Sequence, residues 1–148
     1  MNTPRILAIG KATQDVFLRS EEFSPQMEGK VAYTHLPLGV KMEVEDIIFA
    51  TGGNASNVAV TFARQGLHSS YAWTLGHDPA SETILRDLDN EGVNTSHVVR
   101  RDKYRAGYSN ILIATDGERT ILNNRGVSTD ASAVDLDLEA IADRKSVV

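Results

Sequence analysis

The sequence contains no cysteine in its 148 residues. Without thiols the chain can form no disulfide, no thiolate nucleophile and no sulfur-ligated metal site. A chain without cysteine is compatible with a reducing compartment, so we expect the protein to be cytoplasmic.

Long apolar runs are also absent. The amino-terminal segment MNTPRILAIG has no apolar stretch behind a basic segment, as a secretory signal would have. No part of the chain approaches the roughly 20 apolar residues that a membrane helix needs. We therefore expect neither secretion nor a membrane partner.

Basic residues are few and scattered. The chain has 15 Lys and Arg against 20 Asp and Glu, which gives a net charge of -5. Binding to nucleic-acid phosphates needs clustered cations, so a nucleic-acid partner is not expected. Small neutral or cationic ligands remain open.

The histidines do not suggest a metal site. They show no H-x-x-x-H spacing and have no acidic cluster nearby, which are the patterns that would indicate zinc. We therefore expect no metal bound by this chain through its four histidines, His35, His68, His77 and His97.

The chain does contain an alternation of strand-like and helix-like segments. Residues 5–10 form a short apolar run typical of a strand buried on both faces, and residues 70–75 predict a second strand. Residues 56–65 have helical spacing, and a second helix is predicted between the cap Asp78 and the terminator Gly92. Strands alternating with helices predict a parallel sheet, and the composition favours one domain.

A second set of strands is amphipathic. We expect them at residues 31–36 and 41–50, and a hairpin of residues 108–114 and 119–123 around an Asp-Gly turn. Together they predict a small β lid, with strands at approximately 31–50 and 107–124, added to a three-layer α/β/α sheet. A helix at residues 135–144 and the start of a strand at 146 complete the prediction.

The most informative motif joins a predicted strand to the first predicted helix. It reads Gly52-Gly53-Asn54-Ala55-Ser56-Asn57. Two glycines there would let a ligand approach backbone N–H groups at the positive end of the helix. The alternative is a simple turn in which Asn54 or Ser56 caps the helix.

Asp15 follows the first predicted strand by five residues. Open α/β sheets bind ligands beyond the carboxyl ends of their strands, and a carboxylate there could accept hydrogen bonds from hydroxyl groups. A solvated loop aspartate or a helix cap is the alternative. The nearby Gly10-Lys11-Ala12-Thr13 is not a P-loop, because the first glycine and the final Ser or Thr of that motif are missing.

These segments together resemble the ribokinase-like family of carbohydrate and nucleoside kinases, the phosphofructokinase B type. The resemblance covers nearly the whole chain, and the order of the segments matches. It rests on ILAIGKATQDVF, TGGNASNVAVTFARQG, TLGHDPASETILRDLDNEGVNT and RAGYSNILIATDGERTILNNRG. It implies a ribokinase-like three-layer fold of which this chain is the amino-terminal portion.

The resemblance also implies an acceptor site. Asp15 and Asn57 match the side chains that hydrogen-bond sugar hydroxyls, and the backbone of Gly53 would lie against the sugar. Gly52 and Asn54 belong to the same predicted pocket. The lid would close over the acceptor and exclude water.

Three residues depart from the family pattern. Thr13 stands where many members have asparagine, and Ala106 where many have threonine. Arg125 is unusually polar for its place in NNRG. It could bind a carboxylate or phosphate of the substrate, or it could be an exposed loop arginine.

The family's catalytic motifs have no counterpart in this sequence. The G-x-G-D motif, whose aspartate is the base, and the N-x-x-E motif linked to magnesium are both absent. We therefore expect ATP and Mg²⁺ for the complete family enzyme, bound by no motif of this chain. The chain would supply acceptor binding for phosphorylation of a sugar hydroxymethyl group and have no turnover by itself.

Two alternatives remain open. The acceptor could be a nucleoside, whose base would need an apolar wall from residues such as Phe49, Tyr108 and Ile111. The chain could also be a non-catalytic sugar-binding or assembly module. A homodimer through the lid, or a partner covering the sheet edge, is expected in either case because exposed strand edges associate.

Overall fold

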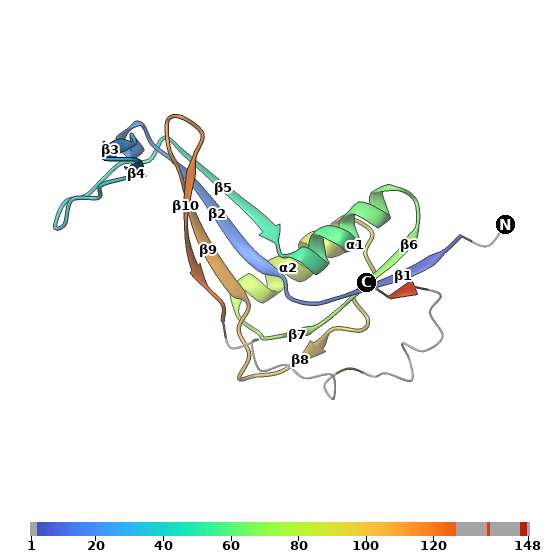
Figure 1. Ribbon diagram of the computed structural model, residues 1–148. Helices are drawn as coiled ribbons and strands as arrows, with labels where there is room; N and C mark the ends of the chain where they lie inside the picture. Colours follow the sequence, from blue (N-terminus) through green and yellow to red (C-terminus); the bar gives the residue numbers. More distant parts are fainter. Residues whose placement is uncertain (1–2, 127–135, 137–145, 148) are drawn as a thin grey trace. The chain divides into compact units, whose positions relative to one another are not determined.

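The computed structural model describes residues 3–126, 136 and 146–147 (Figure 1). The chain divides into two compact units. The first unit takes the described residues of Met1–Gln14, Thr51–Tyr108 and Asn124–Val148. The second takes Asp15–Ala50 and Ser109–Asn123. Each unit is therefore built from separate stretches of the sequence.

The first unit is organised by a parallel sheet in the order β11-β1-β6. Strand β1 (Arg5–Ile9) pairs with β6 (His68–Ala72) from Arg5↔His68 to Ile9↔Ala72, and with β11 (Ser146–Val147). A second parallel pair joins β7 (Thr74–Leu75) to β8 (Val99–Arg100). The expected parallel sheet is confirmed, with the strand at 70–75 divided in two.

Both predicted helices of this unit are present. Helix α1 spans Asn54–Arg64 and α2 spans Pro79–Asn90. Each helix is followed by a glycine with a left-handed φ, Gly66 (80°) after α1 and Gly92 (73°) after α2. The residue after the glycine donates a hydrogen bond to a carbonyl of the last turn, as Leu67 N–H does to Phe62 O at 3.1 Å. The glycines predicted as stops therefore end both helices.

The core of the first unit lies between the helices and the strands. Tyr71 and Leu75 from the strands and Ala59, Ile84 and Leu88 from the helices have no exposed surface or almost none. Ile84 and Leu88 are four residues apart, so one stripe of α2 is apolar and packs inward.

The second unit contains a four-stranded sheet in the order β10-β9-β2-β5. The strands are β2 (Thr13–Arg19), β5 (Asp46–Gly52), β9 (Gly107–Ile113) and β10 (Arg119–Asn124). The boundaries between the two units fall inside these strands. Gln14 of β2, Thr51 of β5 and Tyr108 of β9 still belong to the first unit. A short helix η1 (Glu21–Phe23) and the antiparallel pair β3 (Gln26–Glu28) and β4 (Val31–Tyr33) complete it.

The predicted hairpin is present in this unit. Strands β9 and β10 are neighbours, and Ala114 N–H donates to Glu118 O at 2.8 Å across the turn. Gly117 has φ 89°, and the carboxylate of Asp116 accepts from Glu118 N–H at 3.0 Å. Because a five-residue connection reverses the chain between these two hydrogen-bonded neighbours, they run antiparallel as expected.

Three expectations about elements differ from the structure, and one falls largely outside the described residues. Asp15 was expected in a loop but lies within β2, whose Gln14 and Val16 are buried in alternation with half-buried residues. The strand expected at 31–36 ends at Tyr33, and the one at 41–50 begins only at Asp46. The helix expected at 135–144 lies outside the described residues, apart from Leu136.

Neither α1 nor α2, nor any other helix in the described part of the chain, has the length and apolar character of a membrane span.

Replacing Leu88 tests the core of the first unit. Leu88→Ala removes a side chain with no exposed surface, so we expect the free energy of unfolding to fall by about 2–5 kcal/mol through lost burial and a residual cavity. Urea denaturation measures this change. Asp89→Ala, at the neighbouring exposed position, should change stability little, and an equal loss in both variants would contradict the assignment.

Candidate functional site

The turn between β5 and α1 is the first part of the candidate site. Gly53 occupies the N-cap position with φ 104° and ψ 144°, and no side chain caps the helix. The alternative in which Asn54 or Ser56 caps α1 is therefore wrong. The buried hydroxyl of Ser56 instead donates to the carbonyls of Gly52 at 2.6 Å and Gly53 at 2.9 Å.

Gly53 packs directly against another backbone segment. A Cβ atom on Gly53 would overlap the carbonyl oxygen of Lys11 and lie 2.8 Å from the Cα of Ala12. One residue earlier in the same segment, a Cβ on Gly10 would lie 3.1 Å from that of Ala55. The diglycine turn therefore lies on the segment that follows β1, and only glycine fits at position 53.

This geometry leaves the amino end of α1 open to a ligand. The first N–H groups of an α-helix have no partner within the helix, and the helix dipole makes that end positive. Gly53 at the N-cap has no side chain to cap those groups, and the side chains of Asn54 and Asn57 are exposed on the first turn. The turn thus offers amide donors and acceptors to an oxygen-rich molecule.

The structure brings four of the six predicted site residues onto one turn: Gly52, Gly53, Asn54 and Asn57. Arg125 is exposed and belongs to the same unit, whereas Asp15 is half-buried in β2 and belongs to the second unit. Both residues take part in interactions. The roles of all six residues in an acceptor site stay predictions.

The three residues that depart from the family pattern lie on adjoining backbone segments of the first unit. A Cβ on Gly107 would lie 2.8 Å from Thr13 Cγ2 and 3.7 Å from Arg125 O. A Cβ on Gly126 would lie 2.6 Å from Ala106 O. Their wide separation in the sequence gave no sign of this proximity.

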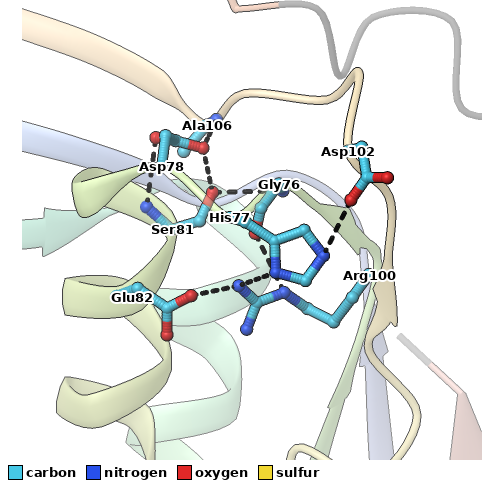
Figure 2. A network of polar contacts seen from close by, with 8 residues as sticks. All are labelled: Gly76, His77, Asp78, Ser81, Glu82, Arg100, Asp102 and Ala106. Carbon is cyan, nitrogen blue, oxygen red and sulfur yellow. Dashed lines mark hydrogen bonds and ion pairs between the residues drawn. The ribbon is translucent and has the colours of Figure 1, made fainter.

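A polar network surrounds the amino end of α2 (Figure 2). Asp78 is the N-cap, as predicted, and its carboxylate accepts from Ser81 N–H at 3.3 Å and from the Ser81 hydroxyl at 2.6 Å. The same carboxylate accepts from Ala106 N–H at 3.3 Å. Asp78 therefore fixes both the start of α2 and the residue that precedes β9.

Arg100 forms the other half of this network. Its guanidinium donates to Gly76 O at 2.9 Å and to the carboxylate of Glu82, and it contacts His77 Nδ1 at 3.3 Å (Figure 2). The hydrogen bond from Arg100 lowers the pKa of Glu82 below its ordinary value. His77 Nε2 lies 3.5 Å from the carboxylate of Asp102. The sequence carried a signal for the Asp78 cap but none for Arg100.

Within the described ranges, no three histidine or acidic side chains gather closely enough to hold a metal ion.

The sequence profile described as pfkB family carbohydrate kinase matches residues 3–148. The chain belongs to this family. Among curated pfkB relatives, it is 33% identical over 91 residues to a fructokinase of Salmonella typhimurium, a match that covers 62% of this chain and 30% of the fructokinase. The chain spans about a third of the length of the curated relatives it matches.

Solved structures show that this pfkB-family chain has the ribokinase-like fold. A PfkB protein from Polaromonas sp. JS666 aligns with a TM-score of 0.74 at 20% identity, over 98% of this chain and 44% of the other. A ribokinase of Arabidopsis thaliana, solved with ribose and ATP, aligns with a TM-score of 0.65 at 21% identity, over 85% and 37%. At these identities the likeness concerns the fold.

Gly53 and Gly66 form a matched pair for testing the turn of this pfkB-family chain. Both have a left-handed φ, but a Cβ on Gly66 would meet nothing within 4 Å. We expect Gly66→Ala to cost about 1–2 kcal/mol of unfolding free energy through backbone strain alone. Gly53→Ala should cost more, about 3 kcal/mol or above, because strain and overlap with Lys11 add. Equal losses in urea denaturation would contradict the close packing.

Glu82 and Glu91 form a second matched pair. Arg100 lowers the pKa of Glu82, and Arg64 lowers that of Glu91. We expect Arg100→Met to return the pKa of Glu82 toward that of a free glutamate and to leave Glu91 unchanged, as followed by NMR titration of the carboxyl carbons.

The sign of the linked stability effect follows from the lowered pKa of Glu82. Its ion pair with Arg100 contributes above the pH range in which a free glutamate titrates, and the contribution is lost as the pH falls through the lowered pKa. The pair is solvent-exposed, so this contribution is small. An unchanged titration of Glu82 in Arg100→Met would contradict the network.

Proposed function

We propose that this chain forms the acceptor-binding part of an ATP-dependent sugar kinase that phosphorylates a hydroxymethyl group. The observation that carries the proposal is the open amino end of α1, where Gly53 leaves the first turn without a side-chain cap and Asn54 and Asn57 are exposed. A sugar presents several hydroxyl groups, each both donor and acceptor, and suits such a turn.

The proposed roles differ among the residues. Asn57 would hydrogen-bond sugar hydroxyls through its amide, and the backbone at Gly52 and Gly53 would lie against the ring. Asp15 would accept hydrogen bonds from hydroxyl groups. Fixing the hydroxyl groups orients the reacting oxygen, and orientation supplies much of the catalysis in phosphoryl transfer.

Membership in the carbohydrate kinase family supports this proposal. Relatives include a fructokinase and ribokinases, and the ribokinase of Arabidopsis thaliana was solved with ribose and ATP. ATP would supply the transferred phosphoryl group, with Mg²⁺ neutralising its charge.

The motifs that the family uses for Mg-ATP have no counterpart in this chain. No G-x-G-D or N-x-x-E sequence occurs in it, and its described part gathers no set of carboxylates or histidines suited to a metal. We propose that other parts of the complete kinase bind Mg-ATP and supply the base, and that the 148-residue chain alone has no turnover.

Arg125 bears on the acceptor's identity. Arg125 is exposed and adjoins the segment that carries Ala106, and its guanidinium is suited to bind a carboxylate. We propose Arg125 as a specificity residue for sugars that carry an acidic group.

A nucleoside acceptor is the second candidate. Phe49 is 66% exposed and could stack on a base, and Tyr108 is 38% exposed. Ile111 is only 5% exposed, which places it in the core and removes it from the proposed base wall.

A thermal-shift panel tests the proposal. D-fructose, D-ribose, D-gluconate and adenosine are each added with and without Mg-ATP. We expect one sugar to raise the melting temperature, because a ligand at a hundredfold excess over its Kd adds about 2.7 kcal/mol to the free energy of unfolding. Mg-ATP alone should leave the melting temperature unchanged. Asp15→Ala should abolish the shift, whereas Asp89→Ala should retain it.

Other outcomes distinguish the alternatives. A shift with adenosine alone would favour the nucleoside kinase. A shift with Mg-ATP alone, or phosphorylation of a sugar by the pure chain, would overturn the proposed division of the sites. A cooperative melt that no acceptor shifts would overturn acceptor binding.

A further inference from the structure

The turn of residues 52–57 is called the acceptor turn here. One hydrogen bond connects the strand that precedes it to helix α2. The hydroxyl of Thr51 donates to Asp87 Oδ2 at 2.7 Å, although the two residues are 36 positions apart. Thr51 is in β5 and directly precedes Gly52, and Asp87 is on α2. Both residues are half-buried and both belong to the first unit.

This hydrogen bond is of a strong type. Its acceptor is a carboxylate, and charge-assisted hydrogen bonds are shorter and stronger than neutral ones. Partial burial limits competition from water, so the bond holds its geometry better than an exposed one would. Asp87 also forms an ion pair with Arg86, whose Nε lies 3.9 Å from Asp87 Oδ1.

Helix α1 itself forms hydrogen bonds to other elements near its middle and at its last residue. Arg64, its last residue, forms a two-pronged ion pair with Glu91 just beyond α2, with Nε to Oε2 at 2.7 Å. Near the middle, the buried Ser69 hydroxyl of β6 donates to Ala59 O at 2.7 Å. The Thr51–Asp87 bond adds a fastening at the opposite end from Arg64, beside the acceptor turn.

The acceptor turn has few side chains of its own that could fix its position. Gly53 has no side chain that could fix it, and no side chain caps α1. Its backbone rests on Lys11 and Ala12, and the strand that delivers it is held by Thr51. Loss of the Thr51 bond would allow Thr51 and Gly52 to shift relative to α2, and the first turn of α1 would shift with them.

We propose that Thr51 and Asp87 are positioning residues for the acceptor site: they hold the diglycine turn and the first turn of α1 in the geometry that binds the sugar, and they do not contact it. This inference rests on the proposed function. It predicts that removing either partner weakens acceptor binding with little change in global stability.

Substitutions at these two positions separate the hydrogen bond from its surroundings. Thr51→Val keeps the shape and removes the hydroxyl, and Asp87→Ala removes the acceptor. Thr51→Ser keeps the hydroxyl donor and Asp87→Asn keeps an oxygen acceptor, so both variants should retain sugar binding. Asp89→Ala, two positions along α2 and exposed, is the matched control.

The first readout is the Kd of the sugar that most stabilises the wild-type chain in the thermal-shift panel, measured by titration calorimetry. We expect Thr51→Val and Asp87→Ala each to raise this Kd on the order of tenfold, since small displacements of binding groups are costly. The double variant should lose no more than either single one, because both remove one interaction. Unchanged affinity in both single variants would overturn the proposal.

The second readout is amide hydrogen exchange and requires no ligand. Asn57 N–H donates to Gly53 O at 3.0 Å in the first turn of α1. We expect Thr51→Val to speed exchange at Asn57 by roughly tenfold through local opening, and to leave Gln65 at the far end unchanged. Uniform acceleration along α1 would indicate a general structural role and would contradict local positioning.

The two readouts separate the failure of this inference from the failure of the proposed function. If no sugar binds the wild-type chain, the proposed function fails, and faster exchange at Asn57 still supports the positioning of the turn by Thr51. If a sugar binds but Thr51→Val changes neither its Kd nor the exchange at Asn57, the positioning inference alone fails.

Discussion

The direct contact between two backbone segments underlies the arrangement of the first unit. Gly53 lies so close to Lys11 and Ala12 that any side chain at position 53 would overlap the Lys11 carbonyl. This contact joins the segment after β1 to the start of α1, which are about forty residues apart in sequence. The same absence of a side chain that permits the contact also leaves the first turn of α1 without a cap, so close packing and the open helix end have one cause.

Local signals were sufficient to predict both helices. Asp78 followed by Pro79 marks the start of α2, and Gly66 and Gly92 supply the left-handed residue that each helix end requires. These signals act within a few residues, so they can be recognised in the sequence without knowing the tertiary structure. The turn at Gly117 was predicted for the same reason.

Strand β2 could not be recognised in this way. Its buried positions include Gln14, and its half-buried positions include Asp15, so polarity and burial do not alternate together. The position of the strand depends on its neighbours in the sheet, β9 and β5, which come from distant parts of the chain. Asp15 was therefore recognised as a site candidate from the motif around it, while its place in a strand was missed.

The candidate site was predicted to a similar extent. The turn from Gly52 to Asn57 was identified because it is contiguous in sequence, but its supports are not. Thr51 bonds to Asp87, and Arg100 reaches Gly76 and Glu82, through pairings that no spacing rule connects. Side chains that meet only after folding leave no periodic signal.

The supports of the acceptor turn have one further property in common. Lys11, Ala12, Thr51 and Asp87, through which these contacts are made, all belong to the first unit. The geometry of the turn therefore depends on contacts inside that unit, and none of these contacts involves a phosphate-binding motif. Under the proposed function, the groups that would recognise the acceptor are positioned by these contacts without ATP, so recognition and phosphoryl transfer would rest on different parts of a kinase chain.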